Sequence, residues 1–598
     1  MNVSEYLIKY IEHQEVKHVF MLSGGGAMYL NDALGHSTKI KYVCNYHEQA
    51  SAVCADAYAR LSGFGVAMVT FGPGAVNALS GAVGAWYDSV PMLVICGQVR
   101  SDLIADYSKV RQLGPQEGDV LSMAKPVVKY AVQLNDVRTI KYELDKAVWS
   151  SKSGRPGPVW VEVPLDIQSA EIDLENQVEF IPPTPIQSLG RDDFLKDLVS
   201  ALKASHRPVL LAGNGFRLSQ TQKELEMLVD TLNIPVLVPY TARSVIGEYN
   251  SNFAGVFGTA GRRSSNIILQ NSDLIISLGV GLSVAKTGFA VDKLAPNARK
   301  IVVDIEEGQI VSHPLKPDSY LVDDLRQFMP DFNKAVKSWK SIHSDWLELS
   351  DVWRRRYPVF ENVKLDADYV DVYRFIEMLS SEMAEGEVVV GGNGLDCVSV
   401  YQGFKLKRDQ EIIINGNWGS MGWELPQSIG AHYATGNRVV CVAGDGSILL
   451  NSQELLLIGK KELPITIFLY NNSGYGSIKA TQNSLFEGHI VGADKTSGVD
   501  NPNFKMLASA YGLEYTLINN DVELVDALPR LMKSATKPRL VELNVSTKQW
   551  ISPKATAFRN EKGKLESKPL DDMAPFLTSE EVERNRTLAF AVFHKEPL

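Results

Sequence analysis

The chain has 598 residues, of which 45% are hydrophobic and 22% are charged, and its formal net charge at pH 7 is -10. This length is more than one hydrophobic core usually organises, so we expect about three or four domains of ordinary size. An acidic protein of this composition is a poor candidate for binding nucleic acid or an anionic membrane surface. We therefore expect a soluble globular protein whose ligands are small molecules.

The N-terminal residues carry charges throughout, which predicts a short amphipathic helix rather than a signal peptide or a transit sequence. The long uncharged run from Val66 to Tyr87 contains Gly72-Pro73-Gly74 and Asn77, so a buried strand, a turn and a buried helix fit it better than a membrane span. The five cysteines lie in apolar contexts without metal-type spacing. These features predict buried thiols and a cytoplasmic protein with no membrane partner.

Three segments, 1–170, 190–335 and 366–550, repeat one pattern in which an apolar, β-branched run ends near glycine and a helix-like stretch follows. The predicted buried strands cover 18–22, 65–72, 90–97, 157–164, 207–215, 234–240, 273–281, 300–306, 387–394, 438–446, 465–472 and 539–545. Such strands, alternating with helices, predict three α/β domains, each with a central parallel sheet flanked by helices. A polar helical connector (336–365) precedes the third segment, and residues 551–598 are predicted to form a charged tail without strands.

The strongest chemical signal lies in the third segment, where Gly444-Asp445-Gly446-Ser447 follows one strand and Asn471-Asn472 ends the next. Parallel strands have their carboxyl ends at the edge where open α/β sheets bind ligands, so Asp445 and Asn472 should lie close together. Glycines let a phosphate approach the backbone, and one carboxylate with one amide oxygen suits Mg²⁺ that is also held by phosphate and water. A helix cap and a simple turn are the alternative interpretation, but the paired placement favours a magnesium diphosphate site.

A second signal is the stretch from Asn45 to Arg60, NYHEQASAVCADAYAR, which places Glu48 in the first turn of a helix made almost entirely of small residues. An acidic residue is common at a helix N-terminus. Small residues, however, allow another backbone to approach closely, which would leave Glu48 in a dry and crowded place. A buried carboxylate needs either a partner or a chemical role.

Together these motifs resemble the thiamine diphosphate signature of the acetohydroxyacid (acetolactate) synthase and pyruvate oxidase superfamily. Other stretches are similar to this family along nearly the whole chain: YHEQASAVCADAYAR to its catalytic-glutamate helix, TFGPGAVNALSGAVGAWYDSVPMLVICGQV and GRPGPVWVEVPLD to its pyrimidine domain, and GNWGSMGWELPQSIGA to the loop that grips the aminopyrimidine. The resemblance implies a pyrimidine-binding domain (1–170), a middle domain (190–335), a pyrophosphate-binding domain (366–550) and a C-terminal tail (551–598).

The resemblance also implies roles for individual residues. Asp445, Asn472 and the carbonyl of Gly474 would bind Mg²⁺. Glu48 would exchange a proton with a pyrimidine nitrogen of thiamine diphosphate, a task that suits a dry site in which the carboxyl stays protonated. In this family Glu48 and the diphosphate site come from different subunits, which implies a homodimer or homotetramer with active sites between subunits.

Two further residues have a plainer alternative. Met421 would hold the cofactor in its bent conformation, although a methionine is otherwise more often a core filler. Gln116 would lie near the reacting centre, although an exposed loop glutamine explains it equally well. The other residues that the resemblance assigns to the cofactor are Gly25, Gly26, Pro73, Asn77, Gly394, Gly419, Gly444, Gly446, Ser447, Tyr475 and Gly476.

The expected type of reaction depends on histidines that the first segment lacks. No histidine occurs between His47 and His206, so the paired histidines that simple 2-oxo acid decarboxylases of the family use as proton donors have no counterpart in the first segment. This favours a decarboxylating carboligase with a 2-oxo acid donor, pyruvate, and a keto acceptor. Thr481 and Pro115 stand where a standard acetolactate synthase has tryptophan and phenylalanine, which predicts room for a larger acceptor. Residues 471–502 and the tail resemble a subgroup associated with surface-polysaccharide sugars, in which the acceptor can be a nucleotide-linked keto sugar.

Two alternative functions remain open, a non-oxidative 2-oxo acid decarboxylase and a flavin-dependent oxo acid oxidase. The middle segment has Arg155 at its border, Gly213-Asn214-Gly215 and Asp304, which are compatible with the family's FAD site. It lacks the histidine and the arginines that are usual there. A middle domain with FAD and one without any ligand are therefore equally well supported.

Overall fold

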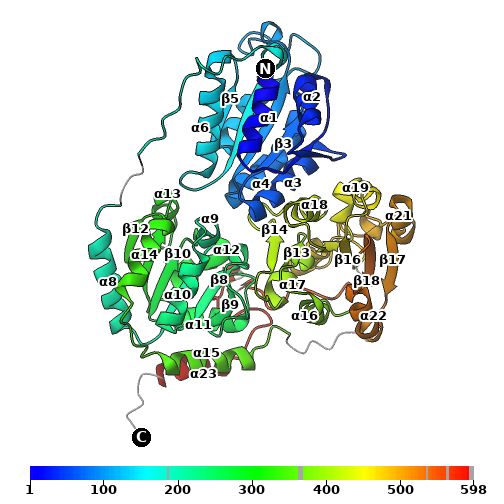
Figure 1. Cartoon of the computed structure of the whole chain (residues 1–598). Coiled ribbons are helices and arrows are strands. Elements are labelled where there is room, and N and C mark those ends of the chain that lie inside the picture. Colours follow the sequence, from blue (N-terminus) through cyan, green and yellow to red (C-terminus); the bar gives the residue numbers. More distant parts are fainter. Residues whose placement is uncertain (185–187, 361–367, 534–535, 560–564, 592–598) are drawn as a thin grey trace.

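The structure is a computed structural model and describes residues 1–184, 188–360, 368–533, 536–559 and 565–591. It contains three six-stranded sheets, each flanked by helices (Figure 1). All neighbouring strands within these sheets are parallel. The predicted fold class, three α/β domains with central parallel sheets, is confirmed.

The first sheet has the strand order β2-β1-β3-β4-β6-β5. Its strands are β1 (His18–Met21), β2 (Lys41–Cys44), β3 (Gly65–Val69), β4 (Met92–Gln98), β5 (Tyr130–Gln133) and β6 (Pro158–Pro164). The helices of this domain are α1 (Val3–His13), α2 (Met28–His36), α3 (Glu48–Ser62), α4 (Pro73–Asp88), α5 (Val120–Ala124), α6 (Ile140–Lys152) and α7 (Leu165–Ser169).

The middle sheet has the order β12-β11-β10-β7-β8-β9, which is the doubly wound order of dinucleotide-binding domains. Its strands are β7 (Pro208–Ala212), β8 (Val236–Pro239), β9 (Phe253–Phe257), β10 (Leu274–Leu278), β11 (Arg299–Asp304) and β12 (Ser319–Val322). The helices are α8 (Arg191–Ala204), α9 (Gly215–Leu218), α10 (Gln222–Leu232), α11 (Arg263–Gln270), α12 (Val284–Thr287), α13 (Glu307–Val311) and α14 (Leu325–Ala335), and α15 (Ser344–Arg356) leads towards the third domain.

The third sheet has the order β14-β13-β15-β16-β18-β17. Its strands are β13 (Val388–Gly391), β14 (Glu411–Ile414), β15 (Val439–Gly444), β16 (Ile465–Asn471), β17 (Glu514–Ile518) and β18 (Arg539–Asn544). The helices are α16 (Val372–Glu382), α17 (Leu395–Gly403), α18 (Glu424–Thr435), α19 (Glu454–Lys460), α20 (Gly476–Leu485), α21 (Phe504–Tyr511) and α22 (Asp521–Lys533).

The first and third sheets share one connectivity, because numbering the strands of each from its own first strand gives the same order. In both, a helix follows the second strand: α3 after β2 and α18 after β14. These two equivalent helices pack directly against each other (Figure 1). Each begins with a glutamate, Glu48 in α3 and Glu424 in α18.

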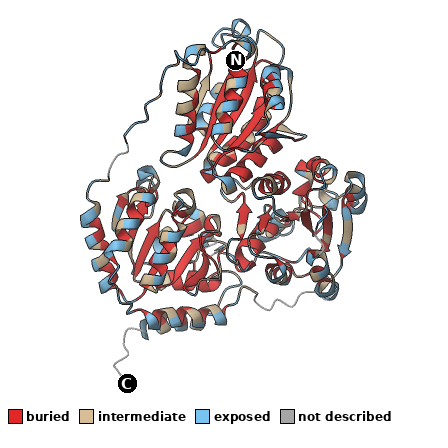
Figure 2. Ribbon diagram, in the orientation of Figure 1, coloured by how far each residue is buried: buried red, intermediate tan, exposed pale blue. Residues whose placement is uncertain are grey.

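The inner strands of all three sheets are buried on both faces, while the outer faces of the surrounding helices are exposed (Figure 2). Every predicted strand is one of these inner strands. The six edge strands, β2, β5, β9, β12, β14 and β17, were not predicted.

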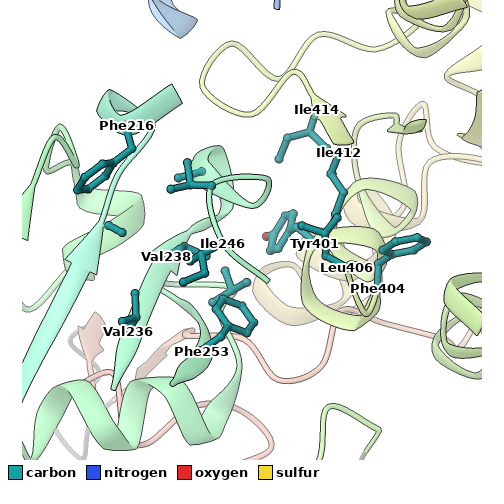
Figure 3. Close-up of a cluster of buried hydrophobic side chains, with 14 of the residues drawn as sticks. Phe216, Val236, Val238, Ile246, Phe253, Tyr401, Phe404, Leu406, Ile412 and Ile414 are labelled. Atoms are coloured by element: carbon teal, nitrogen blue, oxygen red, sulfur yellow. The ribbon is translucent and has the colours of Figure 1, made fainter. Parts of the chain in front are cut away.

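A continuous apolar cluster joins the middle and third domains (Figure 3). The middle domain contributes side chains from α9, β8, β9 and the connection between β8 and β9, and the third domain contributes side chains from α17, β14 and the loop between them. The labelled members are Phe216, Val236, Val238, Ile246 and Phe253 on one side and Tyr401, Phe404, Leu406, Ile412 and Ile414 on the other.

The tail differs from the prediction, which expected no strands there. β19 (Ala557–Arg559) pairs antiparallel with β20 (Leu565–Ser567), and α23 (Ser579–Ala591) follows. α23 packs on α15, where the Trp353 indole N–H donates to Asn585 Oδ1 at 3.1 Å. Strands of three residues are too short to show an alternating pattern, so the sequence does not reveal them.

Four of the five cysteines are buried as predicted, but Cys44 is exposed on the edge strand β2.

Within the described ranges, every helix is too short or too polar to traverse a lipid bilayer.

Candidate active site

The predicted magnesium diphosphate site, called the cradle below, lies at the carboxyl ends of the adjacent strands β15 and β16. Asp445 is 2% exposed and accepts backbone N–H groups from Gly446 at 2.7 Å and from Gly474 at 2.9 Å. Burial raises the pKa of the Asp445 carboxyl, and these hydrogen bonds oppose that effect. The two strand ends therefore meet at one carboxylate.

These strand ends open into a cavity of about 970 Å³. Its lining includes most of the residues that the sequence predicted for the diphosphate, the metal and the bent cofactor: Gly394, Met421, Gly444, Asp445, Gly446, Ser447, Asn472, Gly474, Tyr475 and Gly476. Gly474 has a φ of +120°, and a Cβ on it would lie 2.3 Å from the carbonyl oxygen of Ala493, so the turn admits only glycine here. Gly419 does not line the cavity but accepts the side-chain N–H of Asn393, a neighbour of Gly394, at 2.6 Å.

Two residues that sequence reasoning missed also contact this cradle. The Asn501 side chain donates to the Asp445 carboxylate at 2.7 Å. Lys479 is buried, and its ammonium donates to the carbonyl oxygens of Asn472 and Ser473 at 3.1 and 3.2 Å. Asn501 lies in a loop far from the motif in the chain, and Lys479 is part of α20, so neither has a local signal.

The donor set fits a cation only in company with phosphate oxygens. Among the described residues, no group of three or more histidine, cysteine, aspartate or glutamate side chains could hold a metal ion. One carboxylate, one side-chain amide and one strained carbonyl at the mouth of a glycine-lined cavity match the way proteins hold Mg²⁺ together with a phosphorylated ligand.

Glu48 lies in a second cluster on the first domain. The Asn77 side-chain N–H donates to Glu48 Oε2 at 3.0 Å, and a Cβ on Gly74 would lie 3.0 Å from Glu48 Oε1. The Gln116 carbonyl packs so closely on Gly72, beside Pro73, that a Cβ there would lie 1.7 Å from the carbonyl oxygen. Glu48, Asn77, Gln116 and the start of α4 are thus brought together.

The loop that contains the predicted residues Gly25 and Gly26 is positioned by the residues that follow the strand β3. The backbone N–H of Gly26 donates to Thr70 Oγ1 at 3.2 Å, and its carbonyl accepts the Gln168 side chain at 2.7 Å. A Cβ on Gly26 would overlap the ring of Phe71 at 1.9 Å. The Phe71 ring that lies against Gly26 therefore explains this glycine, while Gly25 has open space around it.

The two clusters do not form one cavity within the described part of this chain. The residues that line the cavity at Asp445 all follow residue 288, so none comes from the first domain. Glu48 itself is of intermediate exposure rather than buried. The expectation of a dry site for Glu48 is not met by a single chain.

The small residues of α3 pack against helices of the same chain. Their neighbours are α4 and α18. A Cβ on Gly430 in α18 would lie 2.2 Å from the Cys54 carbonyl oxygen, and the Cys54 thiol donates to the Pro426 carbonyl at 3.1 Å. The close approach predicted for this helix is present, but it is made within one chain.

Polar contacts beside Glu48 also tie the first domain to the third. Glu454 in α19 accepts the Asn45 side chain and the Tyr46 backbone N–H, both at 2.9 Å. Burial raises the pKa of the Glu454 carboxyl to about 7. The strand end that precedes Glu48 is therefore fixed by the helix that follows the GDGS motif.

A separate cavity of about 500 Å³ lies at the carboxyl ends of the middle strands β7, β10 and β11. Its lining includes Arg155, Asn214, Gly215 and Asp304 from the predicted flavin motifs, but not Gly213. Burial raises the pKa of the Asp304 carboxyl, which accepts the Gly281 backbone N–H at 3.0 Å. Arg155 forms an ion pair with Glu306 at 2.5 Å across the domain border.

Comparison with known proteins agrees with this arrangement. The thiamine pyrophosphate enzymes, named after the other term for thiamine diphosphate, match the chain in three parts: their N-terminal TPP binding domain at residues 1–123, their central domain at 195–332 and their C-terminal TPP binding domain at 392–543. The probable acetolactate synthase large subunit of Methanococcus aeolicus is 30% identical over 92% of this chain and 93% of its own length.

Two further relatives are similar over the same extent. The acetolactate synthase isozyme 3 large subunit of Escherichia coli is 30% identical over 91% of this chain and 94% of its own length. The acetolactate synthase large subunit of Cyanidium caldarium is 29% identical over 92% of this chain and 94% of its own length. With the fold, the cradle and these matches in agreement, the chain belongs to the thiamine diphosphate-dependent enzymes of the acetolactate synthase family.

Proposed function

We propose that the protein is a Mg²⁺- and thiamine diphosphate-dependent carboligase that decarboxylates pyruvate and transfers the two-carbon unit to a keto acceptor. The observation that carries this proposal is the convergence of Asp445, Asn472 and Gly474 on one glycine-lined cavity, in a chain whose relatives are acetolactate synthase large subunits. When bound, thiamine diphosphate supplies a nucleophilic carbon and an electron sink.

In this proposal the third domain holds the cofactor. Asp445, Asn472 and the Gly474 carbonyl bind Mg²⁺, and the backbone around Gly446 and Gly476 accepts the diphosphate. Met421 lines the same cavity and supports the bent conformation of the cofactor. Asn501 fixes the orientation of the Asp445 carboxylate by its 2.7 Å hydrogen bond.

Glu48 holds the proton that the pyrimidine ring requires, and Asn77 orients the Glu48 carboxyl through its 3.0 Å hydrogen bond. Because the described lining of the cavity includes no residue of the first domain, a second copy of the chain must bring its Glu48 to this cavity. We therefore propose a homodimer or a pair of such dimers, with Glu48 and Gln116 of one subunit facing the cradle of the other.

The acceptor side of the cavity supports a large acceptor. Thr481 is exposed on its wall, where its small side chain leaves the space open. Beyond it, the lining includes Lys548, Trp550 and Lys554 near the start of the tail and Phe289 from the middle domain. Two lysines suit the phosphates and exposed aromatic rings suit the base of a nucleotide-linked keto sugar, so we propose that such a sugar is the acceptor.

The middle cavity supports a flavin as a second ligand, because Arg155, Asn214, Gly215 and Asp304 meet at the ends of three strands in a dinucleotide-binding order. A protein that releases yellow FAD on denaturation would bear this out, and a colourless protein would remove both the flavin and the oxidase alternative. Consumption of oxygen during turnover would favour the oxidase.

The decisive experiment is product analysis by mass spectrometry. The protein is incubated with Mg²⁺, thiamine diphosphate and pyruvate, alone and with a panel of keto acceptors that includes nucleotide-linked keto sugars. A carboligase yields acetolactate or an acetyl-branched acceptor. Acetaldehyde as the sole product would instead establish the non-oxidative decarboxylase.

A further inference from the structure

Two buried carboxyl groups, Asp396 and Glu424, lie against each other behind the cradle. Asp396 is in the first turn of α17, and Glu424 is the first residue of α18. Their exposed fractions are 3% and 0%. A Cβ placed on Gly392 would lie 2.0 Å from Asp396 Oδ2 and 3.3 Å from the Glu424 carboxyl carbon. Both carboxyl groups therefore pack against Gly392 and lie close to each other.

One oxygen of each carboxyl in this pair lacks a partner. Asp396 Oδ2 and Glu424 Oε1 have no hydrogen bond within the described structure, and no lysine or arginine charge acts on either carboxyl there. Two adjacent buried carboxylates without a counter-ion are strongly unfavourable, so at least one proton must remain on the pair. Burial raises the pKa of Asp396 to about 7 and that of Glu424 to about 8, and Asp396 adds to the effect on Glu424.

The pair also reaches the cofactor cavity. Asp396 lines the cavity, and its Oδ1 lies on the side of the cradle, 3.4 Å from a Cβ placed on Gly394 and 3.9 Å from one placed on Gly444. On the other side, the Ser447 hydroxyl donates to Glu424 Oε2 at 3.0 Å and accepts the Gly422 backbone N–H at 2.8 Å. The pair thus connects the diphosphate side of the cavity with the loop that carries Met421.

The charges around the cavity determine which protonation state of Asp396 is compatible with a bound diphosphate. Asp445 and Asp396 line one side of the cavity and Glu424 lies behind Asp396, while the buried cation beside Asp445 in the described structure is Lys479, whose charge acts on that carboxyl. A diphosphate would add further negative charge, even with Mg²⁺ bound. An ionised Asp396 would repel it, whereas a protonated Asp396 would offer a hydrogen-bond donor.

We propose that Asp396 and Glu424 share one proton in the cofactor-bound enzyme, and that Asp396 uses it to donate a hydrogen bond to a phosphate oxygen of thiamine diphosphate. Asp396 is therefore a cofactor-binding residue, and Glu424 is a positioning residue that keeps the proton available and holds Ser447. This inference rests on the proposed cradle. It adds that the cradle contains a neutral acid. Cofactor affinity should fall at alkaline pH because this acid then loses its proton.

The test is the dissociation constant of thiamine diphosphate, measured with the full chain at a fixed excess of Mg²⁺ by quenching of tryptophan fluorescence. Asp396→Asn keeps a donor without a titratable proton, so affinity should stay within about threefold of wild type. Asp396→Ala removes the donor and should weaken binding about ten- to hundredfold. If Asp396→Asn weakens binding as much as Asp396→Ala, an ionised carboxylate is required and the proposal is wrong.

The pH profile separates this role from a structural one. From about pH 6.5 to about pH 9.5, wild-type affinity should fall up to about tenfold per pH unit once the pair loses its proton. The double variant Asp396→Asn, Glu424→Gln should lack that component, and parallel profiles would overturn the proposal. The other titratable groups that face the pair, Cys397, Cys441 and Tyr470, have pKa values raised by burial and stay neutral in this range.

Two controls make a failure interpretable. Glu162→Gln replaces a buried carboxyl in the first domain that does not line the cavity, and it should leave the wild-type pH profile unchanged. Asp445→Ala should abolish Mg²⁺-dependent binding. If Asp445→Ala still binds thiamine diphosphate like wild type, the cradle itself is misassigned and the proposed site fails. If Asp445→Ala loses binding as expected but wild-type affinity does not change with pH, only the proposal for the carboxyl pair is refuted.

Discussion

Replacing Gly430 by alanine tests whether the contact between α3 and α18 holds Glu48 in place. A Cβ on Gly430 would lie 2.2 Å from the Cys54 carbonyl oxygen and 3.0 Å from the Cβ of Ala57. Ordinary non-bonded contacts need about 3.5 Å, so the helices would have to separate by roughly 1 Å. Overpacking of this kind costs about 1–3 kcal/mol, and both neighbouring atoms belong to a rigid helix that cannot rotate out of the way.

The assay is thermal unfolding of the cofactor-free protein together with the rate of carboligation. We expect the melting temperature to fall by about 3 °C for each kcal/mol lost, and the turnover rate to fall as well, because α3 begins at Glu48. Gly35→Ala in α2 is the matched control, since a Cβ there meets nothing within 4 Å. If Gly430→Ala melts and turns over like Gly35→Ala, the contact does not support the site.

Three further predictions address the proton, the acceptor and the pH dependence of stability. Glu48→Gln should keep cofactor affinity but abolish deuterium exchange at the reactive carbon of bound thiamine diphosphate, measured by NMR after quenching; exchange at the wild-type rate would contradict the role of Glu48. Thr481→Trp should narrow the cavity wall and lower kcat/KM for a large keto acceptor at least about tenfold while pyruvate self-condensation persists; equal losses for both would show that Thr481 does not select the acceptor. Burial raises the pKa of Glu162 from 4.5 to about 7. The free energy of unfolding therefore has its full value from this group below pH 4.5 and falls by about 3 kcal/mol in all as pH rises through about 7. Glu162→Gln should therefore melt above wild type at pH 8.5 and like wild type near pH 4.5, and a constant difference between the two pH values would refute this assignment.

The inner strands were predictable because each sheet buries them on both faces, which produces continuous apolar runs such as that of β4. Edge strands have only one neighbour and are partly solvated, as β2 and β17 are, so their sequences mix polar and apolar residues. β14, a mostly buried edge strand, is short and preceded by charged residues, which hid it as well.

The candidate site was predictable to the extent that its residues lie in local motifs. Asp445 and Asn472 end two strands that the sequence revealed, and the parallel register brings those ends together. Asn501 reaches Asp445 from a loop 56 positions away, so only the fold could place it there. The stretches that contain Asp396 and Glu424 drew attention only for their glycines and for Met421. Neither stretch indicates that the two carboxyl groups lie close together in the fold.

The outer wall of the active-site cavity comes largely from the tail. Residues 550–552 and 554–557, with Ala574 and Pro575, line the side of the cavity that lies beyond the cradle. The tail is held by hydrogen bonds to the middle domain: the Ala555 backbone N–H donates to the Thr259 carbonyl at 2.6 Å, and the Arg263 guanidinium donates to the Met573 carbonyl at 3.0 Å. In the proposed function the tail therefore forms part of the acceptor side together with Thr481, while the third domain holds the cofactor. Transplanting tails between relatives should then shift acceptor preference while leaving cofactor binding intact, which would make the tail a natural unit for both evolutionary change and engineering.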